Sequence, residues 1–523
     1  MAQQRYDYDQ LMQLGGQFLA ANDFDNAEIA FRAANQLRPD DVVSTFNLAS
    51  MLDAQGRAEA SVELFERANA MHPRESTRLF AMTRQPVVYQ SGDELRTWRS
   101  RLEERIAKLE ASGYRIDAER VPVPTLNIAY QGFDDRDVLE RYGRLVSAPS
   151  PAIYPRRRDA AGDQRIRIGI ISAFLYKHTI GRITRGLFSQ MDREQFHLTA
   201  LAIGNFNDPV AHFIRQHADA YVEVPRASLP AARQTIAQQQ LDVLIYAEIG
   251  LEQFTYTLAH SRLAPVQCVT WGHPATSGIP TIDYFLSSEL IESGDSQQFY
   301  TEKLIKLPNL SVYYYRPSIA GGAKPRAAFG LDDQTHVYGC LQTIYKLHPE
   351  FDPVLDAILS RDPRGIVLIP RGNSRYWDEA LTTRMRRTMP RTFERVRFID
   401  PLPYDDYLQL LTHCDAMLAP IHFGAGNTSY EAFAFGIPTV TLPSDMLKGR
   451  ITLGMYRAMG ISDCIASSAE QYVDIAVRLG TDRDFRRSVH DTILASNHVL
   501  YENPAGVRDL ERFLRDAVAE RAR

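Results

Sequence analysis

The sequence predicts an α/β protein in which two doubly wound, Rossmann-like domains lie in tandem behind an all-α region of helical repeats. The first observation is a 34-residue periodicity over residues 1–73, which is typical of stacked helical pairs. The second is two successive sets of short apolar, β-branched runs separated by helical stretches, typical of parallel sheets covered by helices. A length of 523 residues suits about three domains of roughly 150 residues.

The composition excludes several classes of function. The formal net charge is −5, so the chain has no global positive field, and we expect no nucleic acid partner. No apolar stretch reaches the ~18 residues that cross a bilayer, and the first residues do not resemble a signal peptide. The four cysteines are far apart and form no CxxC pair, which argues against disulfides and zinc knuckles. We therefore expect a cytoplasmic protein without a membrane partner.

The repeat region is expected to span residues 1–117. Large, small and proline positions recur in register, which is the tetratricopeptide pattern of antiparallel helices that interlock through small residues. A helical stretch near 92–112 is expected to cap this short array, and such arrays usually bind peptides or proteins. The positions that recur 34 residues later are Leu11/Thr45, Leu14/Leu48, Gly15/Ala49, Phe18/Leu52, Ala27/Ser61, Phe31/Phe65, Ala34/Ala68 and Pro39/Pro73.

Two α/β domains are expected beyond a connector at 118–163. The first spans 164–315, and the second, 331–523, follows a linker at 316–330 and ends in a terminal helix that is expected to pack back across the hinge of the cleft. Ligands bind at the carboxyl edges of parallel strands, so the site is expected between the two sheets. The expected strands lie at 165–172, 195–204, 241–250 and 265–272 in the first domain, and at 336–342, 365–370, 395–403, 414–421 and 437–443 in the second.

A glycine-rich turn in the second domain is the first candidate for chemistry. Gly424 and Gly426 follow a predicted strand, and Asn427, Thr428 and Ser429 stand where a helix begins. Free amides and the positive end of the helix dipole at such a turn suit a diphosphate. An ordinary capped helix after a flexible turn explains this local pattern equally well.

Lys346 is the second candidate, and it follows Gln342 at the end of the first predicted strand of the second domain. The chain has only seven lysines against 52 arginines, so a lysine at a strand edge is informative. At that edge it would neutralise charge developing on a phosphate leaving group. The alternative is a solvent-exposed lysine.

Five separated motifs, in order, resemble the O-linked N-acetylglucosamine transferase family and its bacterial relatives. The resemblance implies a B-type glycosyltransferase architecture, a UDP-sugar donor, inversion at the anomeric carbon and no required metal or other cofactor. The motifs are RIGIISAFLYKHTIGR, APVQCVTWGHPATSG, QTIYKLHP, FGAGNTSYEAFAFGIPTVTLP and YVDIAVRLGTD, behind the repeats.

The resemblance also assigns donor-site roles. Lys346 matches the lysine that contacts the diphosphate and assists its departure. Glu431 is the nearest acidic residue for the ribose, although it stands one position out of the family's register. The segment PLPYDDY resembles the turn that holds uracil, where Tyr407 would offer an aromatic face; a core tyrosine is the competing interpretation. The remaining UDP-sugar-binding residues are expected to be Gln342, Leu402, Pro403, Gly424, Gly426, Asn427 (where the family often has histidine), Thr428 and Ser429.

The acceptor side is expected in the first domain. His178 follows a strand, His273 lies in a turn that by resemblance lines the sugar pocket, and Glu248 ends a strand as a candidate base or sugar ligand. In well-known relatives a histidine stands where this chain has Arg182, so the role of His178 does not transfer directly. None of the three is a firm assignment of the base.

These observations predict transfer of N-acetylglucosamine or glucose from a UDP-sugar to a serine or threonine of a protein presented by the repeats. Transfer of glucose to asparagine, as in the bacterial adhesin-glycosylating relatives, is the alternative within enzymes. A non-catalytic repeat scaffold with a degenerate sugar-nucleotide domain is the alternative of another class. No carboxylate pair or DxD stretch suggests a hydrolase or a metal site, and no metal ligands are expected.

Overall fold

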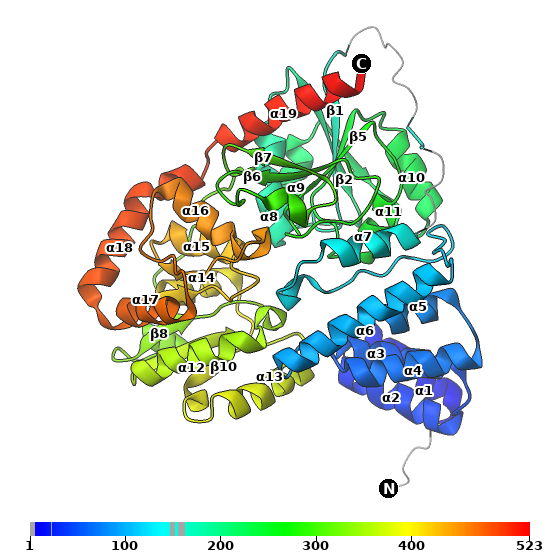
Figure 1. Ribbon diagram of the computed structural model, residues 1–523, viewed down its shortest axis with the longest axis horizontal. Coiled ribbons are helices and arrows are strands. Elements are labelled where there is room, and N and C mark those ends of the chain that lie inside the picture. The colour runs from blue at the N-terminus through cyan, green and yellow to red at the C-terminus, as the bar shows by residue number, and fades with distance from the viewer. Residues whose placement is uncertain (1–5, 22, 147–151, 155–162, 523) are drawn as a thin grey trace.

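The computed structural model describes residues 6–21, 23–146, 152–154 and 163–522. A helical array, two parallel sheets and a long terminal helix make up the molecule (Figure 1). This is the predicted fold class. Part of the expected connector, residues 147–151 and 155–162, lies outside the described residues.

The array consists of paired antiparallel helices that interlock through small residues. Gly15 lies so close to Phe31 that a Cβ there would stand 2.5 Å from the ring, which explains why the first repeat has no side chain at that position. The structure adds a short helix, α5, that the sequence pattern did not predict, between the second repeat and the capping helix. The helices are α1 Tyr8–Ala20, α2 Phe24–Leu37, α3 Val42–Ala54, α4 Ala58–Met71, α5 Glu75–Thr83 and α6 Gly92–Ala111.

The connector contains ordered structure that joins the array to both domains. It includes the 3-10 turn η1 (Ala129–Gln131) and the helix α7 (Arg136–Leu145). Gly143 on α7 packs directly on the backbone of Gly278, where a Cβ would lie 2.0 Å from the carbonyl oxygen. This close packing fixes α7 against the first domain.

The first domain is built on a seven-stranded parallel sheet in the order β3-β2-β1-β4-β5-β6-β7. Four of the strands were predicted, and β3, β6 and β7 were not. The elements are β1 Ile166–Ser172, α8 Thr179–Gln190, β2 Phe196–Ala202, α9 Pro209–His217, β3 Ala220–Glu223, α10 Leu229–Ala237, β4 Val243–Tyr246, α11 Gln253–Ala259, β5 Val266–Thr270, β6 Tyr284–Ser288 and β7 Lys303–Leu307.

The second domain has a five-stranded parallel sheet in the order β10-β9-β8-β11-β12, and each strand lies within a predicted run. In each sheet the strand order reverses beside the strand that comes first in the sequence, β1 or β8. Doubly wound folds bind ligands at this point. The elements are β8 His336–Gly339, α12 Asp352–Arg361, β9 Gly365–Pro370, α13 Arg375–Thr388, β10 Val396–Ile399, α14 Tyr404–Thr412, β11 Ala416–Leu418, α15 Asn427–Ala434, β12 Thr439–Val440, α16 Ile451–Met459, α17 Ala469–Thr481, α18 Arg483–Ser496 and α19 Ala505–Ala522.

The terminal helix α19 returns from the second domain to the first, as expected (Figure 1). Phe513 packs edge-on against Tyr284 of β6, and Asp509 accepts a hydrogen bond of 2.8 Å from the side chain of Asn309. The sequence placed this helix within the range of the second domain, but in space it lies on the first sheet. It therefore links the two domains across their hinge.

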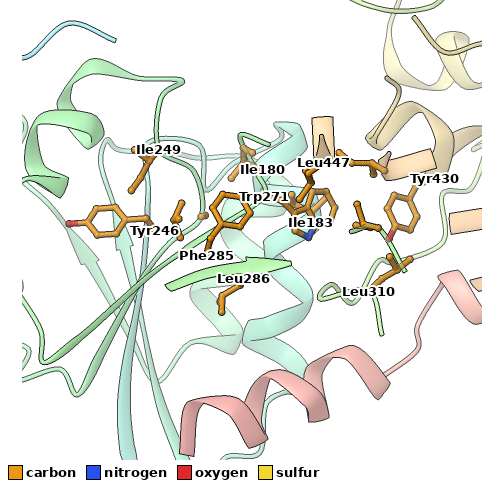
Figure 2. Packing of buried hydrophobic residues seen from close by; sticks show 14 of the residues in the cluster. Ile180, Ile183, Tyr246, Ile249, Trp271, Phe285, Leu286, Leu310, Tyr430 and Leu447 are labelled. Atoms are coloured by element: carbon orange, nitrogen blue, oxygen red, sulfur yellow. The ribbon is translucent and has the colours of Figure 1, made fainter. Parts of the chain in front are cut away.

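The two domains share one apolar core between their sheets. Ile183 of α8 and Trp271, just after β5, lie side by side in Figure 2, with Leu447 of the second domain next to them. The indole of Trp271 donates a hydrogen bond of 2.9 Å to Ser311, which fixes the ring at the floor of the cleft.

No helix among the described residues is both long enough and apolar enough to span a membrane.

Candidate functional site

A cavity of about 350 Å³ lies between the carboxyl edges of the two sheets. It has the position expected for the site of a doubly wound pair of domains. Among the predicted residues, those that line it are Gln342, Lys346, Tyr407, Gly424, Gly426, Asn427, Thr428 and Glu431. The structure therefore brings together side chains from two strand edges of the second domain and places them opposite α8 of the first.

The glycine turn leads directly into α15. Gly426 is the N-cap of this helix and offers no side chain to its first amides, so that end of α15 is left for a ligand at the cavity wall. The hydroxyl of Thr428 accepts a hydrogen bond of 2.5 Å from Gln342 Nε2 and connects the turn to the edge of β8. This arrangement suits an anion at the helix N-terminus.

Lys346 faces this turn from the segment after β8. Its ammonium donates a hydrogen bond of 2.9 Å to Gln342 Oε1 and lies 5.0 Å from the ring centroid of Phe423. Burial lowers the pKa of Lys346 to about 8, and no carboxylate in the described part of the chain forms an ion pair with it. A buried ammonium without a counter-charge is unfavourable by itself, and a bound diphosphate would supply that charge.

Glu431 is a buried carboxylate at the centre of a polar cluster. It accepts hydrogen bonds from Tyr404 and Tyr407 of α14, both at 3.0 Å, and from Asn427 at 2.7 Å. Arg182 of α8 forms an ion pair with it at 3.1 Å, so the cluster joins the two domains. These partners favour the charged form, but burial outweighs them and raises the pKa of Glu431.

Arg182 also stacks on the ring of Tyr404, with its guanidinium carbon 3.7 Å from the ring centroid. It lines the cavity, at the position where the family resemblance expects histidine. Its pairing with Glu431 spans residues that are 249 positions apart in the sequence. No local pattern indicated that pairing.

The three candidates from the first domain do not line the cavity. His178 caps α8 by accepting a hydrogen bond from the Ile180 amide, and burial lowers its pKa to about 4. Burial likewise lowers the pKa of His273 to about 4 and raises that of Glu248 to about 8. All three are therefore mostly neutral at pH 7, and their catalytic roles stay predictions.

Three donor-side candidates also lie outside the lining. Ser429 is fully buried and hydrogen-bonded to Thr452 at 2.9 Å, so its hydroxyl supports the turn from behind. Leu402 and Pro403 lie at the exposed start of α14. Most of the other lining residues stand within or beside the predicted motifs, and that proximity is the signal that would have found them. They are Thr179, Ile183, Trp271, Gly272, Pro274, Leu341, Thr343, Tyr404, Phe423 and Ile451.

The connector contributes an aromatic wall next to the cavity. The ring of Tyr130 lies 4.5 Å from that of Tyr345 and 4.6 Å from that of Phe423, measured between centroids. Asp135, further along the connector, forms buried ion pairs with Lys448 at 2.7 Å and with Arg99 of α6 at 2.9 Å. The helical array is thus joined to the walls of the site by packed and charged contacts.

The two sheets and the cleft between them define the B-type glycosyltransferase architecture. The chain superimposes on a solved structure described as a Thermobaculum terrenum O-GlcNAc transferase mutant, with a TM-score of 0.74, 20% identity and coverage of 98% of both chains. Glycosyl transferase family 41 matches residues 140–314 and 322–501. The chain belongs to this family, which confirms the family expected from the motifs.

Two curated relatives differ in the sugar that their names state. The chain is 24% identical over 389 residues to a probable UDP-N-acetylglucosamine–peptide N-acetylglucosaminyltransferase, SEC, of Arabidopsis thaliana, covering 72% of this chain and 39% of that protein. It is 25% identical over 264 residues to a UDP-glucose:protein N-β-glucosyltransferase of Actinobacillus pleuropneumoniae, covering 48% and 40%. The chain spans about two fifths of the length of these relatives.

Proposed function

We propose that this protein transfers a sugar, N-acetylglucosamine or glucose, from a UDP-sugar to a serine or threonine hydroxyl of a protein. The observation that carries the proposal is the buried Lys346 ammonium facing the uncapped N-terminus of α15 across the cavity. The ammonium and the positive end of the helix dipole both favour an anion there, and among the described residues no carboxylate forms an ion pair with Lys346. A nucleotide diphosphate matches that arrangement in charge.

In this reaction the acceptor oxygen attacks the anomeric carbon from the face opposite the diphosphate, with inversion. The bond from that carbon to the diphosphate oxygen breaks, and its electron pair leaves with UDP. Lys346, Thr428 and the α15 amides stabilise the charge that develops on the leaving oxygen, so no metal ion is required for this step. The acceptor hydroxyl loses its proton in this step. His178, Glu248 and His273 stay the predicted candidates for the group that receives it.

Glu431, with Tyr404 and Tyr407, is proposed to hold the nucleoside. Tyr404 and Tyr407 both line the cavity on the side of α14. Tyr407 is proposed to offer the face of its ring to uracil. The Glu431 carboxylate is already placed to accept hydrogen bonds from hydroxyl groups, and ribose hydroxyls are donors of the same kind as the tyrosines that occupy it.

The helical array is proposed to present the acceptor protein. Support comes from its rigid attachment to the second domain through the fully buried Arg384. An ion pair of 2.9 Å with Asp352 holds Arg384 within that domain, and its guanidinium donates a hydrogen bond of 2.9 Å to the backbone carbonyl of Tyr89 in the repeat region. An acceptor held on the array would therefore keep a fixed position relative to the cavity. We also propose a reducing, cytoplasmic location, because all four cysteines are buried and unpaired.

Transfer of glucose to asparagine is the second candidate. It is favoured by the similar identity to an N-glucosyltransferase, 25%, and to a peptide N-acetylglucosaminyltransferase, 24%. Both reactions use the same leaving group, so the donor side of the cavity does not discriminate between them.

The test is mass spectrometry of proteins co-expressed with the chain, with its Lys346→Ala variant and with Lys303→Ala, which removes an exposed lysine of β7 as a matched control. We expect a hexose or N-acetylhexosamine mass shift with the wild type and with Lys303→Ala, and none with Lys346→Ala. Fragmentation places the sugar on oxygen or on nitrogen. Normal UDP binding by an enzyme that modifies no acceptor and does not hydrolyse a UDP-sugar would support the scaffold alternative.

A further inference from the structure

A cluster of two histidines and one carboxylate lies outside the donor cavity. His348 and Glu350 belong to the segment that follows Lys346, and His422 immediately precedes Phe423 in the glycine turn. One ligand atom from each of the three side chains lies within 4.8 Å of the others. His422 Nε2 is 2.9 Å from Glu350 Oε2, and His348 Nδ1 is 3.9 Å from the same oxygen.

The backbone around the cluster is arranged for the side chain of His422. His422 has a φ of 69°, a left-handed conformation that a residue other than glycine seldom adopts. Its ring packs against Gly132 of the connector, where a Cβ would stand 2.9 Å from the ring. The rings of His348 and His422 meet edge to face with centroids 4.5 Å apart. Three chain segments therefore converge on one point.

The three ligand atoms favour one kind of ion. Two imidazole nitrogens and one carboxylate oxygen suit Zn²⁺ and similar first-row ions, whereas Mg²⁺ and Ca²⁺ prefer oxygen alone. His348 is buried and its ring is hydrogen-bonded to the backbone of Gln131, the type of contact that orients a metal-binding histidine. The side chain of Glu350 is 56% exposed and that of His422 is 27% exposed, so an ion can enter and these two side chains can adjust.

The cluster also has contacts that stabilise it without an ion. The Glu350 amide donates to His348 Nδ1 at 3.2 Å, and Glu350 pairs with His422. The first is a long hydrogen bond and the second is a partly exposed ion pair, each worth about 1 kcal/mol or less. Coordination by a divalent ion, with Zn–N and Zn–O distances of about 2.0–2.2 Å, would replace both contacts.

We propose that His348, Glu350 and His422 form a binding site for a divalent transition-metal ion such as Zn²⁺, with water completing the coordination. The ion would clamp the segment that carries Lys346 to the turn that carries Gly424 and Gly426. It takes no part in the transfer step and lies outside the residues that line the donor cavity. The metal site is independent of the proposed function.

The experiment is calorimetric titration of metal-stripped, full-length protein with ZnCl₂, and separately with MgCl₂. We expect one Zn²⁺ per chain and no detectable Mg²⁺ binding. His422→Asn keeps a residue that tolerates the left-handed backbone, and Glu350→Gln keeps the shape of an exposed side chain; each is expected to weaken Zn²⁺ binding at least tenfold. His498→Asn, at an exposed histidine of the turn after α18, is the matched control and is expected to bind Zn²⁺ like the wild type.

A second measurement separates the metal site from a purely structural role. Thermal unfolding is recorded with and without Zn²⁺, and the midpoint is expected to rise with Zn²⁺ in the wild type and in His498→Asn only. Absence of Zn²⁺ binding by the wild type, or equal Zn²⁺ binding by Glu350→Gln, would overturn the proposal. Because these titrations contain no UDP-sugar, a failure of UDP binding would count against the proposed function and leave the metal site standing.

Discussion

The affinity of this protein for UDP is expected to fall as the pH rises above 8. Burial lowers the pKa of Lys346 to about 8, so the free protein loses the positive charge of this ammonium between pH 7 and pH 9. A bound diphosphate stabilises the charged form and raises the pKa of Lys346 in the complex. Binding above pH 8 therefore requires uptake of a proton, and each further pH unit weakens it.

The magnitude follows from the protonated fraction. With a pKa of about 8, roughly nine tenths of the free protein carries the charged lysine at pH 7 and roughly one tenth at pH 9. The dissociation constant for UDP should rise about tenfold between these values, equivalent to about 1.4 kcal/mol. The second pKa of a phosphate group is about 6, so the ligand is already mostly ionised at pH 7 and contributes little over this range.

Calorimetry of UDP binding at pH 7, 8 and 9 measures this effect, and three variants define its source. Lys346→Arg keeps its charge throughout, so its affinity should be independent of pH; Lys346→Ala should bind more weakly with an equally flat profile. Lys303→Ala, at an exposed position, should reproduce the wild-type profile. A flat wild-type profile, or the same slope in Lys346→Ala, would refute the assignment of the buried lysine to the diphosphate.

Glu431→Ala is expected to lower the free energy of unfolding by about 3 kcal/mol, because it leaves Arg182 in the cleft without its carboxylate; urea denaturation measures the loss. Glu431→Gln keeps an acceptor oxygen and should lose less. Gly143→Ala is expected to lower the thermal midpoint, because the new Cβ would lie 2.0 Å from the carbonyl oxygen of Gly278, and this backbone atom cannot move aside as a flexible side chain could. Gly16→Ala is its control, since no atom outside the local backbone lies within 4 Å there and alanine favours helices.

Two results would contradict these structural arguments. Both variants lack the ion pair with Arg182, so if Ala and Gln at Glu431 lose the same free energy of unfolding, the hydrogen bonds that the Gln oxygen can still accept contribute nothing. If Gly143→Ala and Gly16→Ala have the same thermal midpoint, the contact between α7 and the first domain is looser than its geometry indicates.

The local patterns that predicted the fold are those that need no distant partner. The 34-residue period identified the helical pairs because each repeat carries its own large and small positions, such as Phe31 against Gly15. Buried parallel strands such as β4 and β9 are continuous apolar runs, so they stand out in the sequence. The helix α5 and the strand β3 were missed because each is short and neither carries a long apolar run.

The sequence by itself determined that two parallel sheets lie in tandem, where the glycine turn and Lys346 stand along the chain, and the family, although it did not indicate β3, β6 and β7. Only the tertiary structure decided which side chains meet: Arg182 with Glu431, Tyr130 with Phe423, and His348 with His422. It also showed that His178, Glu248 and His273 do not line the cavity. The physical reason is that strands and turns follow from local conformational preference, whereas contacts between residues far apart in the sequence exist only after the segments and domains that carry them have packed together.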